Sequence, residues 1–151
     1  MTTVILDISR LISRVRHHTP SGVDRVEMAY ARGLQRLYGD NLAFAAVHPT
    51  GRYGRIDRAT ALAYLDELER RWTSEDGSNG QRSIASVLPW MVRLLPKPVP
   101  AGGARSILVQ GSPHHLIDRA KGARKLAAEN ARFVCMVHDL IPIDRKSTRL
   151  N

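Results

Sequence analysis

The chain has 151 residues, of which 43% are hydrophobic, and it carries a formal net charge of +9. A chain of this length buries one hydrophobic core but not two, so we expect one full domain. No apolar run is long enough to cross a bilayer, and the chain starts with neither a basic leader nor a small-residue cleavage site, which predicts a cytoplasmic protein. The single cysteine, Cys135, excludes a disulfide and a cysteine-based metal site within the chain, and we expect it to be a small buried hydrophobic residue.

The positive charge favours anionic partners, namely phosphorylated substrates, nucleic acid or an anionic membrane surface. An arginine-rich proteome explains the charge equally well. The last eight residues, DRKSTRLN, match one reading frame of a common sequencing adapter. We therefore expect residues 1–143 to be the native domain and residues 144–151 to be a disordered, non-native tail. Without that tail the chain loses three positive charges and one negative charge, so the net charge falls from +9 to +7.

The chain begins with a predicted strand and a predicted helix. Residues 4–8 form a β-rich run typical of a central parallel strand, with Asp7 near its end. The next segment is too long and too basic for a dinucleotide-binding turn, and G-x-G-x-x-G does not occur, so a nicotinamide cofactor is disfavoured. Ser21 with Asp24 predicts a helix start, and Gly39 predicts its end. This amphipathic helix has apolar residues at helical spacing: Val23, Val26, Tyr30, Leu34 and Leu37.

The beginning of this helix is a candidate phosphate site. A helix that starts after Pro20 points unpaired backbone N–H groups toward the strand ends, and Gly22 lets a phosphate approach them closely. Ser21 and Gly22 are therefore candidate residues for binding a phosphorylated ligand. An ordinary capped loop explains the same pattern, and both interpretations stay open.

The middle of the chain predicts a second strand over residues 42–47, a loop over 48–54 and a helix over 59–72. The apolar face of that helix consists of Leu62, Leu65, Leu68 and Trp72.

A polar connection then leads to an apolar segment over residues 84–95, which is too short to span a bilayer. We expect this segment to be a helix packed on the sheet. The alternative is a segment that lies in a membrane interface through Trp90, flanked by Arg93 and Lys97.

Residues 107–110 predict the third parallel strand. His114 and His115 then start the next predicted helix, whose inward-facing residues are expected to be Ile117, Ala120 and Leu126.

Residues 133–137 predict a buried parallel strand that presents His138 and Asp139 at its carboxyl end. Ligands of open α/β sheets bind at that end, so His138 and Asp139 are the candidate catalytic residues. The whole pattern alternates strands and helices. It predicts an α/β fold with a Rossmann-like parallel sheet, helices on both faces and right-handed crossovers.

Other chemistries find little support in the sequence. The histidines His17, His18, His114 and His115 form adjacent pairs, whose side chains diverge, and no H-x-x-x-H spacing occurs. The carboxylates form no recognisable ligand motif, so we expect no metal. No G-x-S-x-G nucleophile elbow occurs either.

Three motifs together resemble the N-terminal half of retaining glycosyltransferases of the group 1, or family 4, type, which have the two-domain GT-B fold. They are ILDISRL at residues 5–11, TPSGVDRVEMAYARGL at 19–34 and VHDLIPI at 137–143. The resemblance implies a bacterial enzyme of capsule, exopolysaccharide or lipopolysaccharide biosynthesis. Such an enzyme transfers a sugar from a nucleotide-sugar donor to a polysaccharide or lipid-linked acceptor.

The resemblance also assigns roles to particular residues. It implies that Gly22 approaches the donor diphosphate and that His138 contacts the transferred sugar. It implies no metal cofactor, since the nucleotide sugar is a co-substrate. The C-terminal domain of such enzymes, with its nucleotide-binding surface and paired-glutamate signature, has no counterpart in this sequence. We therefore expect a fragment that is inactive by itself, cytoplasmic, and in peripheral contact with the anionic inner face of the cell membrane.

A basic nucleic-acid-binding α/β module without catalytic activity is the alternative function. The positive charge supports it, whereas aromatic residues make up only 5% of the chain and no helix-turn-helix or RNA-binding signature occurs.

Overall fold

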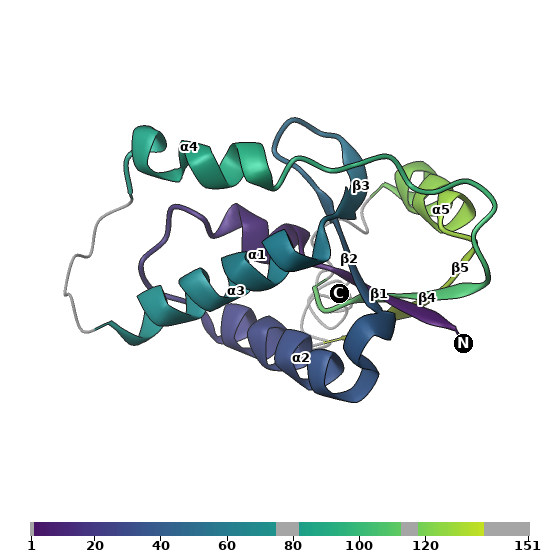
Figure 1. Ribbon diagram of the computed structural model, residues 1–151, viewed down its shortest axis with the longest axis horizontal. Helices are drawn as coiled ribbons and strands as arrows, with labels where there is room; N and C mark the ends of the chain where they lie inside the picture. The colour runs from purple at the N-terminus through teal and green to yellow at the C-terminus, as the bar shows by residue number, and fades with distance from the viewer. Residues whose placement is uncertain (1, 75–81, 113–117, 138–151) are drawn as a thin grey trace, which may run out of the picture.

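The computed structural model describes residues 2–74, 82–112 and 118–137. These residues form a five-stranded sheet in the order β3-β2-β1-β4-β5, flanked by helices (Figure 1). The strands are β1 (Thr3–Asp7), β2 (Leu42–Val47), β3 (Tyr53–Ile56), β4 (Ser106–Gln110) and β5 (Ala131–Cys135). The helices are α1 (Ser9–Ser13), α2 (Gly22–Tyr38), α3 (Arg58–Thr73), α4 (Ile84–Arg93) and α5 (Arg119–Ala128), and a short 3₁₀ turn, η1 (Gly39–Asn41), follows α2.

The predicted Rossmann-like α/β fold is confirmed. β1 pairs in parallel with β2 on one side and with β4 on the other, and β5 pairs in parallel with β4. Successive residues of β1 enter different cores, because neighbouring side chains of a strand point to opposite faces. Val4 and Leu6 belong to the larger core with α1, α2, α3 and α4, while Ile5 packs on the other face, where α5 contributes Leu126.

The prediction of a loop over residues 48–54 was wrong in its last part, because Tyr53–Ile56 forms β3, antiparallel to β2. Gly51 closes the hairpin turn with a φ of 83°, in the left-handed region that favours glycine. The outer edge of β3 then bridges to Lys97. A Cβ on Gly54 would lie 2.2 Å from the Lys97 carbonyl oxygen, so only glycine admits this close approach.

Helix α2 begins and ends as predicted, but it buries a different face. The buried residues are Asp24, Glu27, Met28 and Ala31, whereas Val26, Tyr30 and Leu37 are 36%, 44% and 78% exposed. α3 lies alongside α2, and Arg32 joins them through Asp66 at 2.5 Å and Glu69 at 2.7 Å. The polar residues of α2 are buried because segments from elsewhere in the chain surround them. The spacing of apolar residues within α2 does not predict these contacts.

The apolar segment over 84–95 forms a helix, as predicted, which covers Ile84–Arg93. It packs on α3 and the end of β2 rather than across the sheet: the Trp90 ring meets Tyr64 edge-on at 5.4 Å, and His48 Nε2 lies 3.0 Å from the Met91 carbonyl oxygen. Val87 and Leu94 are buried, while Ile84, Leu88 and Val92 are exposed. No helix among the described residues is long and apolar enough to cross a membrane.

The expectation of a buried strand near the end of the chain was wrong. β5 is the edge strand of the described sheet, with Phe133 38% and Val134 50% exposed, and Cys135 is half-buried rather than buried. An apolar run predicts a strand, but its burial depends on a second neighbour. Ala120 is exposed instead of inward-facing. α5 also starts later than predicted, with Asp118 as its N-cap, whose side chain accepts a hydrogen bond from the Lys121 N–H at 3.0 Å.

Candidate functional site

The carboxyl ends of β1 and β4 form the topological switch point of the sheet. The chain leaves β1 toward β2 on one side, and it leaves β4 toward β5 on the other. In open α/β sheets the crevice at this point is the usual ligand site. A cavity of about 190 Å³ opens there, between these strand ends and α2. Its lining comes from Leu6, Asp7, Ile8, Leu11, Glu27, Tyr30, Val109, Gln110, Gly111, Val134, Cys135 and Met136.

Glu27 is the most unusual residue of this cavity. Its side chain projects from the second turn of α2 and is 5% exposed. Gly111, the residue that follows β4, lies directly against the Glu27 side chain. A Cβ on Gly111 would lie 3.0 Å from Glu27 Cγ, so glycine at this position makes room for the glutamate. Burial raises the pKa of Glu27 to about 7; Arg10 opposes the increase, while the charges of Asp7 and Asp24 add to it. The carboxyl therefore exchanges its proton near neutral pH.

Asp7 shares the cavity but is held by the protein. Its Oδ1 accepts hydrogen bonds from the backbone N–H of Ser9, at 2.9 Å, and from the Ser9 hydroxyl. Lys125 Nζ lies 3.5 Å from its Oδ2. The Ser9 hydroxyl in turn accepts the Val47 N–H at 2.8 Å. Asp7 thus ties the end of β1 to β2 and α5, which makes it a structural carboxylate beside Glu27.

The predicted residues Ser21 and Gly22 lie at the start of α2. Ser21 caps the helix: its Oγ accepts the Asp24 N–H at 3.3 Å, and its N–H donates to Asp24 Oδ2 at 2.8 Å. Arg10 Nη2 also lies 3.3 Å from that Oγ. Gly22 is exposed, its φ is outside the left-handed region, and a Cβ there would meet nothing within 4 Å. Any special role of Gly22 therefore depends on the open space in front of it, and the ligand-binding assignment of both residues stays a prediction.

Asp24 anchors two arginines behind this helix start. Its side chain is fully buried, and the Nε atoms of Arg10 and Arg14 lie 2.8 Å and 2.9 Å from its oxygens. Burial alone would raise the pKa of Asp24, but hydrogen bonds from Ser21, Arg14 and Arg10 outweigh it and lower that pKa. The carboxylate stays ionised and holds two guanidinium groups next to the N-terminus of α2.

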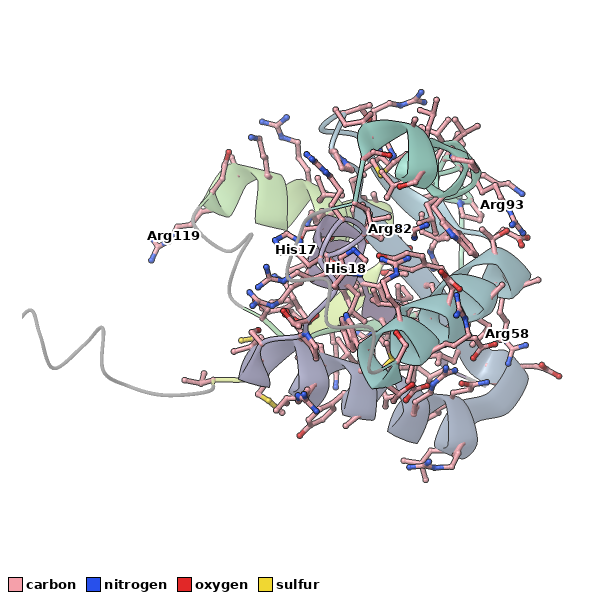
Figure 2. All side chains as sticks on the ribbon, turned by 90° about the vertical axis from the view of Figure 1, so that its left-hand side faces the viewer. His17, His18, Arg58, Arg82, Arg93 and Arg119 are labelled. Carbon is pink, nitrogen blue, oxygen red and sulfur yellow. The ribbon has the colours of Figure 1, made fainter. Side chains whose placement is uncertain are left out.

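More basic side chains gather on the side of the molecule toward which β1 points. Figure 2 views this side and has His17 and His18 close to Arg82 near its centre. The two segments are joined by the backbone: the Arg82 N–H donates to the Arg16 carbonyl oxygen at 2.9 Å. Burial lowers the pKa of His17, and the neighbouring Arg14 lowers it further. Burial and the neighbouring arginine thus favour the neutral form of His17.

The predicted catalytic residues His138 and Asp139, and the histidines His114 and His115, lie outside the described residues. The strand that precedes His138 and Asp139 ends at the edge where the cavity opens, and the Met136 N–H donates to the Gln110 carbonyl oxygen at 3.1 Å. The described residues hold no group of three or more histidine, cysteine, aspartate or glutamate side chains arranged for a metal ion.

Sequence reasoning missed Glu27. A signal was present in the helical spacing, which puts four residues on one face of α2: Asp24, Glu27, Met28 and Ala31. A glutamate that shares a face with Met28 and Ala31 is unusual and marks a candidate buried carboxyl. No family model, curated protein or solved structure matches the chain. The geometry of the cavity and the resemblance of the three motifs therefore carry the functional argument.

Proposed function

We propose that the chain is the N-terminal, acceptor-side domain of a retaining glycosyltransferase of GT-B type. The enzyme would transfer a sugar from a nucleotide-sugar donor to a polysaccharide or lipid-linked acceptor in bacterial capsule or lipopolysaccharide biosynthesis. The observation that carries this proposal is the cavity at the switch point, which is lined by Glu27 and Tyr30 of α2 and so contains a buried glutamate. This domain supplies one wall of the catalytic cleft and a second domain supplies the other, so the fragment alone does not catalyse transfer.

In this proposal the donor diphosphate lies at the N-terminus of α2. The open space beside Gly22 supports that position, since a Cβ added there would meet nothing within 4 Å. Arg10 and Arg14 share the single carboxylate of Asp24, so this cluster keeps one net positive charge beside the positive end of the helix dipole. These groups stabilise a leaving diphosphate without a metal ion. In keeping with the resemblance, His138 contacts the transferred sugar, and Asp139 is the second candidate catalytic residue.

A lipid-linked acceptor fits a domain that rests on the inner face of the cell membrane, and α4 supports such a contact. Ile84, Leu88 and Val92 form an exposed apolar stripe and are 68%, 54% and 58% exposed, while the opposite side of α4 packs on the core. The chain has no acidic residue between Asp76 and Asp118, but it has several basic ones there. An apolar stripe within a segment of positive charge is typical of a helix that lies on an anionic membrane.

The alternative of a nucleic-acid-binding module finds less support. Several arginines of the described chain pair with carboxylates instead of forming a continuous basic face; examples are Arg32 with Asp66 and Glu69, and Arg55 with Glu129. Binding of a mixed-sequence DNA or RNA oligonucleotide with a steep salt dependence would favour that alternative.

A matched pair of variants tests the donor site. Gly22→Val and Gly33→Val add the same side chain to the same helix, and a Cβ meets nothing within 4 Å at either position. Titration with UDP-glucose and GDP-mannose, followed by amide chemical shifts, should give weak saturable binding at the start of α2. Gly22→Val should weaken that binding at least tenfold, and Gly33→Val should leave it unchanged. Equal effects of both variants, or no saturable shift in the unmodified chain, would contradict the proposed function.

A further inference from the structure

We propose that Glu27 is a ligand-binding residue, through which the cavity takes an uncharged, hydroxyl-bearing ring such as a pyranose. Three observations carry this inference: the side chain is almost wholly buried, it lines a cavity of about 190 Å³, and Gly111 leaves room for it where any other residue would press on it. The choice of a sugar ring rests on the proposed function, whereas the role of Glu27 rests on the geometry.

The walls of the cavity define the class of ligand. Apart from Glu27, Asp7 and Gln110, the lining is mostly aliphatic, with Leu6, Val109 and other apolar residues. A pyranose combines apolar C–H faces with hydroxyl groups, and it therefore matches aliphatic walls with few polar groups. A protonated carboxyl donates one hydrogen bond and accepts others, so it complements a hydroxyl group. The polar partner is built into the cavity before the ligand arrives.

The charges around Glu27 favour a neutral ligand over a cationic one. Arg10 on α1 faces Glu27, and Lys125 on α5 already pairs with Asp7 at 3.5 Å. A neutral ring that fills the cavity displaces water from the Glu27 carboxyl and thereby removes the solvation that an ionised carboxylate needs. The bound state therefore holds the protonated acid. Because the Glu27 carboxyl has a pKa of about 7 in the ligand-free protein, the protein takes up a proton when it binds the ring at or above neutral pH.

The other titratable and charged groups around Glu27 come from four of the elements around the cavity. They are Asp7 at the end of β1, Arg10 on α1, Asp24 and Tyr30 on α2, and Cys135 on β5. Substitution of Glu27 separates the pH dependence of binding that Glu27 causes from any pH dependence that these neighbouring groups cause. Glu27→Gln keeps the shape and the ability to donate and accept hydrogen bonds, but it cannot ionise. Glu69→Gln, on α3 where Glu69 pairs with Arg32, is the control outside the cavity.

The experiment titrates the chain with methyl glycosides of glucose, galactose, mannose and N-acetylglucosamine at pH 6 and pH 8, followed by amide shifts of the cavity residues. We expect at least one glycoside to bind saturably, and about tenfold more weakly at pH 8 than at pH 6, since the protonated fraction of a group with a pKa of about 7 falls by that factor. Glu27→Gln should bind with the same affinity at both pH values. Glu69→Gln should behave like the unmodified chain.

Several outcomes overturn the inference. They are the absence of saturable glycoside binding, a pH dependence that persists in Glu27→Gln, and preferential binding of an amine such as methylamine at pH 8. These failures are distinguishable from failure of the proposed function. Loss of glycoside binding with intact nucleotide-sugar binding removes only the role of Glu27. Glycoside binding without any nucleotide-sugar binding removes the transferase and leaves a proton-linked carbohydrate-binding site.

Discussion

Replacing Glu27 by glutamine should stabilise the protein at neutral and alkaline pH. The folded chain keeps the Glu27 proton up to a pKa of about 7, whereas the unfolded chain releases it near the model-peptide value of 4.5. Glu27 therefore favours folding most below pH 4.5. This contribution is lost as the pH rises from 4.5 through 7, because the folded protein must then bury a carboxylate. The raised pKa corresponds to about 3 kcal/mol of unfolding free energy, fully lost above pH 7.

Glutamine has the same shape but no charge, so the variant escapes this cost. Glu27→Gln should gain about 3 kcal/mol over the unmodified chain at pH 8, which amounts to a rise of about 6–12 °C in Tm for a domain of this size. At pH 4.5 the two proteins should have nearly equal stability. Urea denaturation followed by circular dichroism at pH 4.5, 6, 7 and 8 measures the difference. A stability difference that does not change with pH would refute the reasoning.

Glu129→Gln provides the control of opposite sign. Glu129 is equally buried, at 4% exposed, but Arg55 Nη2 lies 2.7 Å from its carboxylate and the Tyr53 hydroxyl donates to it at 2.9 Å. Removing its charge leaves the Arg55 guanidinium without a counter-charge, so the variant should lose about 2 kcal/mol or more. Stabilisation by both substitutions would mean that burial alone, and not the presence of a partner, sets the effect. A stabilising substitution that also abolishes the pH dependence of ligand binding is typical of a functional residue.

Three further predictions concern other parts of the molecule. Leu88→Ser combined with Val92→Ser should reduce binding to phosphatidylglycerol vesicles several-fold. Leu37→Ser, at a leucine that is 78% exposed on α2, should leave that binding unchanged. Equal losses of vesicle binding, or a concentration-dependent dimer that disappears in the double variant, would argue against membrane docking. Gly54→Ala should destabilise the fold by about 1–3 kcal/mol in urea denaturation, because its Cβ would meet the Lys97 carbonyl oxygen at 2.2 Å, whereas Gly33→Ala should be neutral or stabilising. The purified chain should transfer no sugar from UDP-glucose or GDP-mannose to a glycan acceptor, and measurable turnover would exclude the proposal that it is an incomplete enzyme.

The sequence by itself determined the elements that local signals specify. β2 spans the predicted residues 42–47, and α2 starts at the predicted capping box of Ser21 and Asp24 and ends at Gly39. In each case neighbouring residues set the backbone conformation: β-branched and apolar runs favour a strand, and a cap followed by glycine bounds a helix. The alternation of these elements was enough to predict the α/β fold. The assignment of a binding site to the N-terminus of α2 also came from its own residues, and it stays a prediction.

Only the tertiary structure decided which surfaces are buried. Residues distant in sequence surround the polar face of α2: Arg10 and Arg14 hold Asp24, and Gly111 leaves the space that Glu27 occupies. β5 is an edge strand for a similar reason, since its burial depends on a second neighbour rather than on its own apolar residues. Hydrophobic periodicity indicates which secondary structure a segment favours. The desolvation of a carboxyl group depends instead on all the residues packed around it. The raised pKa of Glu27, and with it the candidate site, is therefore a property of the folded molecule.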